Sequence, residues 1–153
     1  MRSAGFTLIE LMVVLAVVGL LAGVTVPQMG PAMAAARIKS SGRDVASALR
    51  HTRALAISQH RPCQFFLDMR QHVYQLCDGR KRYALPSALE IKLDTASTLL
   101  VSDHQGSIEF YPDGSSSGGR VTIRYGQRGV QLDVNWLTGM VTETEVTGAG
   151  KAN

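Results

Sequence analysis

The sequence contains few cysteines, few aromatic residues and little charge. Only two of its 153 residues are cysteine, Cys63 and Cys77, which allows one disulfide in an oxidising compartment or two buried thiols in a reducing one. Charged residues make up 18% of the chain and hydrophobic residues 45%, which excludes a disordered chain and a protein of many membrane spans. No lysine follows the glycines of residues 114–119, so this loop does not resemble a phosphate-binding loop. The length and composition predict one globular domain with a modest core.

The charge balance is mildly basic, with a formal net charge of +4 and a pI of about 9.4. This value is compatible with an anionic partner but does not require one, because a basic surface mainly keeps a protein soluble.

A long hydrophobic run occupies the N-terminus, from Phe6 to Val26. As a helix it would be roughly 30 Å long, the thickness of the hydrocarbon core of a bilayer. Pro27 removes a helical hydrogen bond and predicts a helix break there. The sequence therefore predicts a transmembrane helix over residues 6–27. One carboxylate, Glu10, lies inside it, at a cost of roughly 2.5–3.5 kcal/mol on insertion scales.

Two simple interpretations of this run are open. One is a secretory signal peptide, with Arg2 as its basic end, residues 11–24 as its apolar core and cleavage near residues 32–34. Glu10 counts against it, since an acidic residue between the basic end and the apolar core is unhelpful. The other is a plain single-span anchor. By charge bias it would point its globular part into the cytoplasm, because Arg2 stands alone before the run and three basic residues follow it: Arg37, Lys39 and Arg43.

The stretch "GFTLIEL", from Gly5 to Leu11, resembles the signature of type IV prepilins. In that family a short basic leader ends in glycine, phenylalanine follows, and a glutamate lies five residues into the mature chain. The resemblance implies that a prepilin peptidase cuts between Gly5 and Phe6 and that Phe6 becomes N-methylated. Pro27 also falls where pilin-like stalks commonly carry a proline. The implied location is the bacterial inner membrane, with a single pass and a periplasmic C-terminal domain, and this overrides the charge bias.

Cleavage after Gly5 would give Glu10 a partner. In a staggered helical filament, the Glu10 carboxylate of one subunit could accept a hydrogen bond from the amino terminus of Phe6 of the next. Two unit charges at ~4 Å attract by roughly 4 kcal/mol at an effective dielectric of 20, which offsets an insertion cost of similar size. Because this attraction is available only on assembly, we predict that Glu10 is an assembly residue.

Residues 28–61 predict a stalk helix. Its apolar residues recur at helical spacing along one stripe, which predicts that the helix packs on the domain; they are Ile38, Val45, Leu49, Thr52 and Ala56. Most basic residues lie off the stripe, namely Lys39, Arg43, Arg50 and Arg53. They indicate a solvated face, with binding of nucleic acid or acidic lipid as the alternative. Pro62 marks the end of the helix.

Two short strands with alternating polarity follow, residues 63–68 and 72–77. Paired as a hairpin, they would set Asp68 opposite His72 and Cys63 opposite Cys77, at a separation that suits a disulfide. A zinc site is the alternative, since His60, Cys63, His72 and Cys77 are suitable ligand types. Their spacing matches no standard zinc finger, so we predict the disulfide and no metal.

Further strand candidates continue to the C-terminus, separated by glycine-rich turns; they are residues 89–93, 107–111, 120–126, 129–136 and 140–146. A long helix followed by short antiparallel strands predicts an α+β fold, with two packed sheets over residues 62–147 and a flexible tail at 148–153. We expect Trp136, the single tryptophan, to lie in the core.

The second half of the chain resembles the GspH/FimT family of minor pseudopilins. The resemblance lies in "FYPDGSSSGG", residues 110–119, and in "LTGMV", residues 137–141. It implies a pilin-like fold and a minor subunit near the tip of the type II secretion pseudopilus, which supports protein export across the outer membrane. The implied partners are other minor and major pseudopilins, the prepilin peptidase and inner-membrane lipid.

FimT-like relatives serve type IV pili, and some bind DNA for uptake. Those chains often end in a glycine-arginine motif with alternating basic residues. Here Gly139 is followed by Met140, Val141, Thr142 and Glu143. The missing basic ending favours secretion over nucleic-acid binding, and a FimT-like pilin that binds DNA stays as the alternative.

One catalytic pattern is present, because residues 114–118 fit G-x-S-x-G. A nucleophile elbow needs a helix after the serine, whereas a strand pattern follows here, so the segment indicates a hairpin connection. Asp103, His104 and Asp113 lie nearby in sequence, which by itself is no triad. We predict no catalytic residue, no enzymatic activity and no cofactor. A secreted hydrolase behind a cleavable signal peptide is the alternative from another class.

Overall fold

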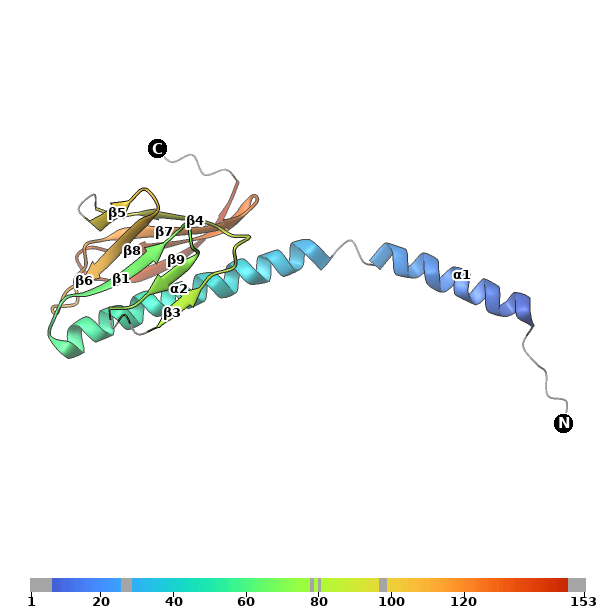
Figure 1. The fold of residues 1–153 in the computed structure, drawn as a ribbon, viewed down its shortest axis with the longest axis horizontal. Coiled ribbons are helices and arrows are strands. Elements are labelled where there is room, and N and C mark those ends of the chain that lie inside the picture. The colour runs from blue at the N-terminus through green and yellow to red at the C-terminus, as the bar shows by residue number, and fades with distance from the viewer. Residues whose placement is uncertain (1–6, 26–28, 78, 80, 97–98, 149–153) are drawn as a thin grey trace. The chain divides into compact units, whose positions relative to one another are not determined.

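The computed structural model describes residues 7–25, 29–77, 79, 81–96 and 99–148, and side chains within these ranges except at 20–25, 29–32 and 34. Contacts between Cα atoms divide the chain into two compact units, Met1–Ala34 and Ala35–Asn153. Two helices precede nine strands (Figure 1): α1 (Leu8–Thr25), α2 (Met29–Gln59), β1 (Cys63–Asp68), β2 (Val73–Gln75), β3 (Arg82–Ala84), β4 (Glu90–Asp94), β5 (Leu100–Ser102), β6 (Gln105–Phe110), β7 (Gly119–Tyr125), β8 (Arg128–Val134) and β9 (Val141–Thr147).

Both predicted helices are present. The predicted break at Pro27 lies outside the described residues. The apolar stripe predicted on α2 is confirmed, because all five of its residues are buried: Ile38, Val45, Leu49, Thr52 and Ala56. The helix ends at Gln59, and His60 adopts a φ of 52°, the left-handed conformation that commonly terminates helices.

The strands form two antiparallel sheets, which confirms the predicted α+β fold. One sheet has the order β3-β2-β1-β6-β5 and the other the order β4-β7-β8-β9. Each predicted strand candidate overlaps an observed strand, with ends that differ by up to two residues. The sequence did not reveal β3 and β5, since each has only three residues and a period of two needs a longer stretch to be recognised.

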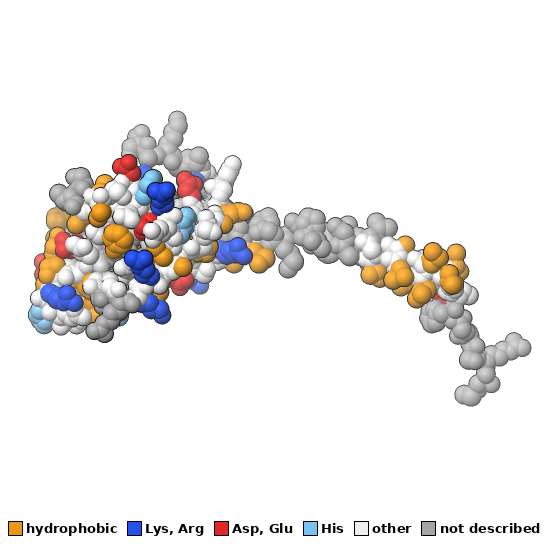
Figure 2. All heavy atoms as spheres, in the orientation of Figure 1, with side chains coloured by type: hydrophobic (Ala, Val, Ile, Leu, Met, Phe, Trp, Pro, Cys, Tyr) orange, Lys and Arg blue, Asp and Glu red, His pale blue; other side chains and the backbone are white. Residues whose placement is uncertain are grey.

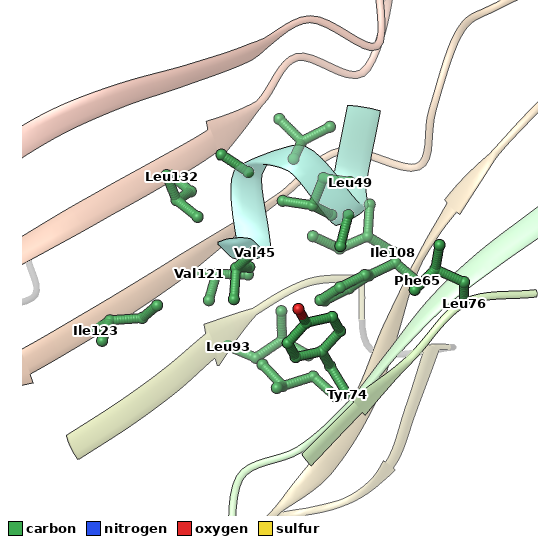
Figure 3. Packing of buried hydrophobic residues seen from close by; sticks show 14 of the residues in the cluster. Val45, Leu49, Phe65, Tyr74, Leu76, Leu93, Ile108, Val121, Ile123 and Leu132 are labelled. Carbon is green, nitrogen blue, oxygen red and sulfur yellow. The ribbon is translucent and has the colours of Figure 1, made fainter. Parts of the chain in front are cut away.

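The core lies where α2 meets the inner faces of both sheets. Figure 3 shows Val45 and Leu49 of α2 among side chains from each sheet. Leu132 comes from the four-stranded sheet and Phe65 from the five-stranded sheet, and both are fully buried. In β1 the inward positions Cys63, Phe65 and Leu67 alternate with less buried ones, as expected of strands with one face on a core.

The hairpin of β1 and β2 occurs at the predicted place, but the predicted register is wrong by one residue. Asp68 pairs with Val73 and not with His72. His72 has a φ of 53° and belongs to the connecting turn, which is therefore one residue longer than expected. Cys63 and Cys77 are consequently not opposite each other in the ladder, since β2 ends at Gln75.

The prediction that Trp136 lies in the core is also wrong, because the side chain is 66% exposed. The reason is that β8 ends at Val134, so its inward and outward alternation does not extend to Trp136. Trp136 lies instead in the turn before β9, with its Cβ close to Gly118.

Candidate functional site

The N-terminal unit presents an apolar helix surface. From Leu8 to Val18 the large apolar side chains of α1 are at least 50% exposed, with Leu8 at 78%. Figure 2 shows hydrophobic side chains over the described part of this helix. Within the part of the chain that the structure describes, no helix is long and apolar enough to cross a membrane. A surface of this kind on α1 needs a covering partner or environment, because exposed apolar patches rarely remain bare.

Glu10 lies in the first turn of α1 and is exposed. The carbonyl of Thr7 accepts hydrogen bonds from the N–H groups of Glu10 and Leu11, which places the carboxylate at the N-terminal end of the helix. The two salt bridges in the described part of the chain, Lys92–Asp94 and Arg120–Asp133, do not involve Glu10. The predicted cleavage residues Gly5 and Phe6 lie outside the described residues.

Cys63 and Cys77 form a disulfide, with their Cα atoms 5.1 Å apart. The disulfide is present although the predicted register is not, and Cys77 lies beyond the end of β2. The thiolates are therefore unavailable to zinc, and His72 places its Nε2 2.8 Å from the carbonyl oxygen of Leu89. The described residues contain no group of three or more metal-ligating side chains.

The G-x-S-x-G segment lies between β6 and β7, so a strand follows it as predicted. The predicted hairpin connection is wrong, because β6 belongs to the five-stranded sheet and β7 to the four-stranded sheet, and the segment passes from one sheet to the other. Ser116 is 5% exposed, and its hydroxyl donates a hydrogen bond to the carbonyl of Asn135. The same oxygen accepts a hydrogen bond from the N–H of Gly118. Ser115 is bonded to Asp113 in the same loop. Ser116 holds the loop to the β8–β9 turn, whereas the hydrogen bonds of Ser115 stay within the loop. No hydrogen bond within the described residues joins either serine to a histidine.

A buried carboxylate, Asp68, connects β1 to its neighbours. Its Oδ1 accepts hydrogen bonds from the N–H groups of Arg70 and Gln71, and its Oδ2 accepts one from the side-chain amide of Gln105, on β6. Burial by itself raises the pKa of this carboxyl, but the hydrogen bonds from Gln71, Gln105 and Arg70 outweigh burial, and the pKa is lowered from 3.8. Asp68 is a structural group that stabilises the hairpin turn.

Two hollows flank α2 in the globular unit. One of about 480 Å³ lies between α2 and strands β8 and β9, and its lining includes the charged residues Lys39, Arg128, Glu143 and Glu145. The other, of about 570 Å³, lies between α2 and β3 and is lined by Asp44, His51, Arg82 and Tyr83, among others. Burial next to this second hollow raises the pKa of Tyr74 to about 12.

The sequence did not reveal a contact that joins α2 to two loops. The Nε of Arg53 donates a hydrogen bond to the carbonyl of Gly114, 2.9 Å away. Gly139 has a φ of 61°, and a Cβ on it would lie 2.7 Å from the same Nε. The glycine at position 139 predicted a turn in the sequence, but it did not indicate that this turn contacts Arg53.

The helix followed by two antiparallel sheets, together with the methylation signature at the N-terminus, defines a pilin-like protein. A family model described as "Prokaryotic N-terminal methylation motif" matches residues 1–26. A second, described as "Type II transport protein GspH", matches residues 41–139, so the chain belongs to the GspH family.

Individual relatives agree with this assignment. The chain is 31% identical over 137 residues to Type II secretion system protein H of Xanthomonas campestris pv. campestris, covering 90% of this chain and 80% of that protein. Its fold resembles the minor pseudopilin EpsH from the Type 2 Secretion System of Vibrio cholerae, with a TM-score of 0.55, 10% identity, and coverage of 71% of this chain and 96% of that one. It also resembles the type IV minor pilin FimU of Pseudomonas aeruginosa, with a TM-score of 0.54, 12% identity, and coverage of 70% and 87%.

Proposed function

We propose that this chain is a minor pseudopilin of the type II secretion system and assembles near the tip of the periplasmic pseudopilus that supports export across the outer membrane. The observation that carries the proposal is that one chain combines the N-terminal methylation motif with a GspH match over residues 41–139. The Xanthomonas relative, a type II secretion system protein H, supports the same role.

The proposed organisation follows the predicted boundaries. Residues 1–5 are a leader that the prepilin peptidase removes between Gly5 and Phe6, and Phe6 is then N-methylated. Residues 6–27 cross the inner membrane once, with the helix break at Pro27, and residues 28–61 form the periplasmic stalk. Residues 62–147 are the domain and 148–153 a flexible tail. The exposed apolar side chains of α1 support a lipid-facing or subunit-facing role for this segment.

Glu10 is the residue to which we assign assembly. Its carboxylate lies at the N-terminal end of an apolar helix and forms no ion pair among the described residues. The amino terminus of Phe6 on a neighbouring pseudopilin would supply the missing cation, and it exists only after the leader is removed. The chain is in this proposal a substrate of the peptidase and a structural subunit, without catalysis of its own.

The experiment is complementation of a strain that lacks the gene. The full chain should restore export of secreted enzymes, and cross-linking should connect it to the major and minor pseudopilins. A FimT-like role is the second candidate, favoured by the fold likeness to FimU and by the basic residues on α2. That role would instead restore pilus-dependent DNA uptake and give DNA binding that weakens steeply with salt. Uptake without export would overturn the secretion proposal.

A further inference from the structure

The turn between β8 and β9, residues 135–140, exposes large apolar side chains on a firmly held backbone. Trp136, Leu137 and Met140 are 66%, 63% and 63% exposed. The Oδ1 of Asn135 accepts a hydrogen bond from the N–H of Leu137 at 3.0 Å. The carbonyl of Asn135 accepts one from Gly139 at 2.8 Å, and its N–H donates to the carbonyl of Met140 at 3.0 Å. A surface held in place in this way loses little entropy on binding.

The same turn is attached to α2 and to the neighbouring loop. The carbonyl of Trp136 accepts a hydrogen bond from the N–H of Ser116, and Gly139 packs against the Arg53 side chain. Ile57, one turn further along α2 and 40% exposed, approaches the loop at Gly114. We call the surface formed by Ile57, Trp136, Leu137 and Met140 the distal patch, because it lies at the end of α2 farthest from Ala35, where the globular unit begins (Figure 1).

The charge next to the distal patch is positive. A side-chain nitrogen of Arg50 donates a hydrogen bond to the carbonyl of Val141, directly after Met140, and Arg53 reaches the adjoining loop. Between Asp44 and Asp68 the chain has no acidic residue. The carboxylate of the adjoining loop, Asp113, is engaged by Ser115. An occupant with apolar side chains and carboxylates would complement this surface.

The positive charge of the distal patch and its place at the end of α2 argue against two possible occupants, a second copy of this chain and a lipid surface. In a two-fold symmetric pair, a second copy of the chain would bring its own Arg50 and Arg53 against the same two cations, which is unfavourable. A lipid surface is disfavoured because the 25 residues from Ala35 to Gln59 put roughly 37 Å of helix between the start of the unit and the patch. Exposed tryptophan and methionine beside arginine are instead the composition of the energetically dominant residues at protein interfaces.

We propose that the distal patch is a docking surface for a neighbouring pseudopilin, which inserts apolar side chains flanked by carboxylates. This inference rests on the proposed function and adds to it the face and the chemistry of one contact. Trp136 fills a hollow on the partner, and Arg50 pairs with a partner carboxylate at the edge of the contact.

The test is photo-cross-linking of the full chain in cells that express the complete secretion system with tagged pseudopilins. A benzophenone amino acid replaces Leu137 in one variant, Val13 of α1 in a second and Tyr125, exposed at the end of β7, in a third. We expect Leu137 to cross-link to one pseudopilin, Val13 to one or more, and Tyr125 to none. Products at Val13 without any at Leu137 would overturn the patch and leave the proposed function standing, whereas none at either position would overturn both.

The identity of the Leu137 product separates the occupants. A product with a differently tagged copy of this chain, or with a photoactivatable lipid, would assign the patch to self-association or to the membrane and overturn the proposal. With a pseudopilin product in hand, Arg50→Glu should lower its yield at least about tenfold, as expected for loss of one important contact. Arg43→Glu, an exposed position two turns earlier on α2, should leave the yield unchanged. An equal yield of the cross-linked product in Arg50→Glu would overturn the proposed pairing of Arg50 with a carboxylate of the partner.

Discussion

Asp68 is an example of a buried charge that is fully satisfied by hydrogen bonds. It is 4% exposed, yet three donors hold its two oxygens. Because the pKa of its carboxyl is lowered from 3.8, the ionised form stabilises the fold above that pH, and the contribution is lost as the pH falls through the lower folded-state value.

We predict that Asp68→Ala lowers the free energy of unfolding by about 1–3 kcal/mol at neutral pH, since it leaves buried N–H groups without acceptors. The wild-type protein should lose stability as the pH falls below 3.8, and the variant should lose less over the same range. Urea denaturation of the detergent-solubilised chain at several pH values measures both effects. Asp103→Ala, in an exposed turn, is the control and should have little effect. Identical pH profiles for wild type and Asp68→Ala would contradict the assignment.

The second residue-scale prediction concerns Glu10. Glu10→Gln keeps the side-chain size and removes the charge, so membrane insertion should be unchanged or improved, because a neutral amide costs less to bury than a carboxylate. Processing after Gly5 should continue, while cross-linking to other pseudopilins and export should both fall. Glu90→Gln, at an exposed position of β4, should behave as wild type. Normal cross-linking and export in Glu10→Gln would show that the pairing of Glu10 is dispensable. Loss of processing would show that the prepilin peptidase recognises Glu10.

At the scale of elements, α2 packs unusually closely on the four-stranded sheet at Gly42. A Cβ added there would lie 2.6 Å from Cγ1 of Val130, a side chain only 2% exposed. Glycine therefore lets helix and sheet approach where any larger residue would separate them.

We predict that Gly42→Ala destabilises the protein, although alanine raises helix propensity by up to about 1 kcal/mol. Forcing apart a packed contact costs typically about 1–3 kcal/mol, so packing outweighs propensity. Ser47→Ala, at an exposed position of the same helix, is the control and should be neutral or slightly stabilising. Thermal unfolding followed by circular dichroism compares the variants. A higher melting temperature for Gly42→Ala would contradict this prediction, because it would show that β8 can shift away from α2 at little cost.

The disulfide acts on the hairpin element. Cys63 and Cys77 are 14 positions apart, and in the chain-entropy account closing such a loop contributes roughly 3 kcal/mol. We predict that the double change Cys63→Ser with Cys77→Ser lowers the urea midpoint, and that adding reductant to wild type has the same effect. Alkylation under denaturing, non-reducing conditions should label neither cysteine in protein purified from its native membrane. Labelling of both would mean that the bond does not form in the cell.

At the scale of the whole molecule, the prediction concerns the residue at which the mature chain begins. We predict that it begins at N-methylated Phe6, since the chain matches the N-terminal methylation motif over residues 1–26 and the prepilin signature predicts cleavage after Gly5. Intact-mass analysis of protein purified from its native membrane measures this directly. A terminus near Ala35 would mean a signal peptidase product, and the pseudopilin proposal would be wrong.

Local sequence patterns were sufficient to predict both helices and all strands except β3 and β5. The stripe on α2 from Ile38 to Ala56 and the alternation in β1 are periodic over enough residues to be read without a structure, and the burial of each agrees. The N-terminal signature likewise identified the superfamily, because a peptidase reads a short linear segment. The cysteine pair was predicted from a register that was wrong, although the disulfide itself is present.

Only the tertiary structure decided how the elements meet. The sequence by itself determined two helices, most of the strands and the pilin-like class, because each depends on interactions between residues near in the chain. The strand register at Asp68, the exposure of Trp136 and the Arg53 contact with Gly114 depend on residues distant in the chain. His72, one extra turn residue with a positive φ, shifts the register between β1 and β2 by one position. Because β8 ends at Val134, Trp136 lies outside the strand and is exposed to solvent. Such outcomes are set by competition among packed neighbours, which periodicity does not encode.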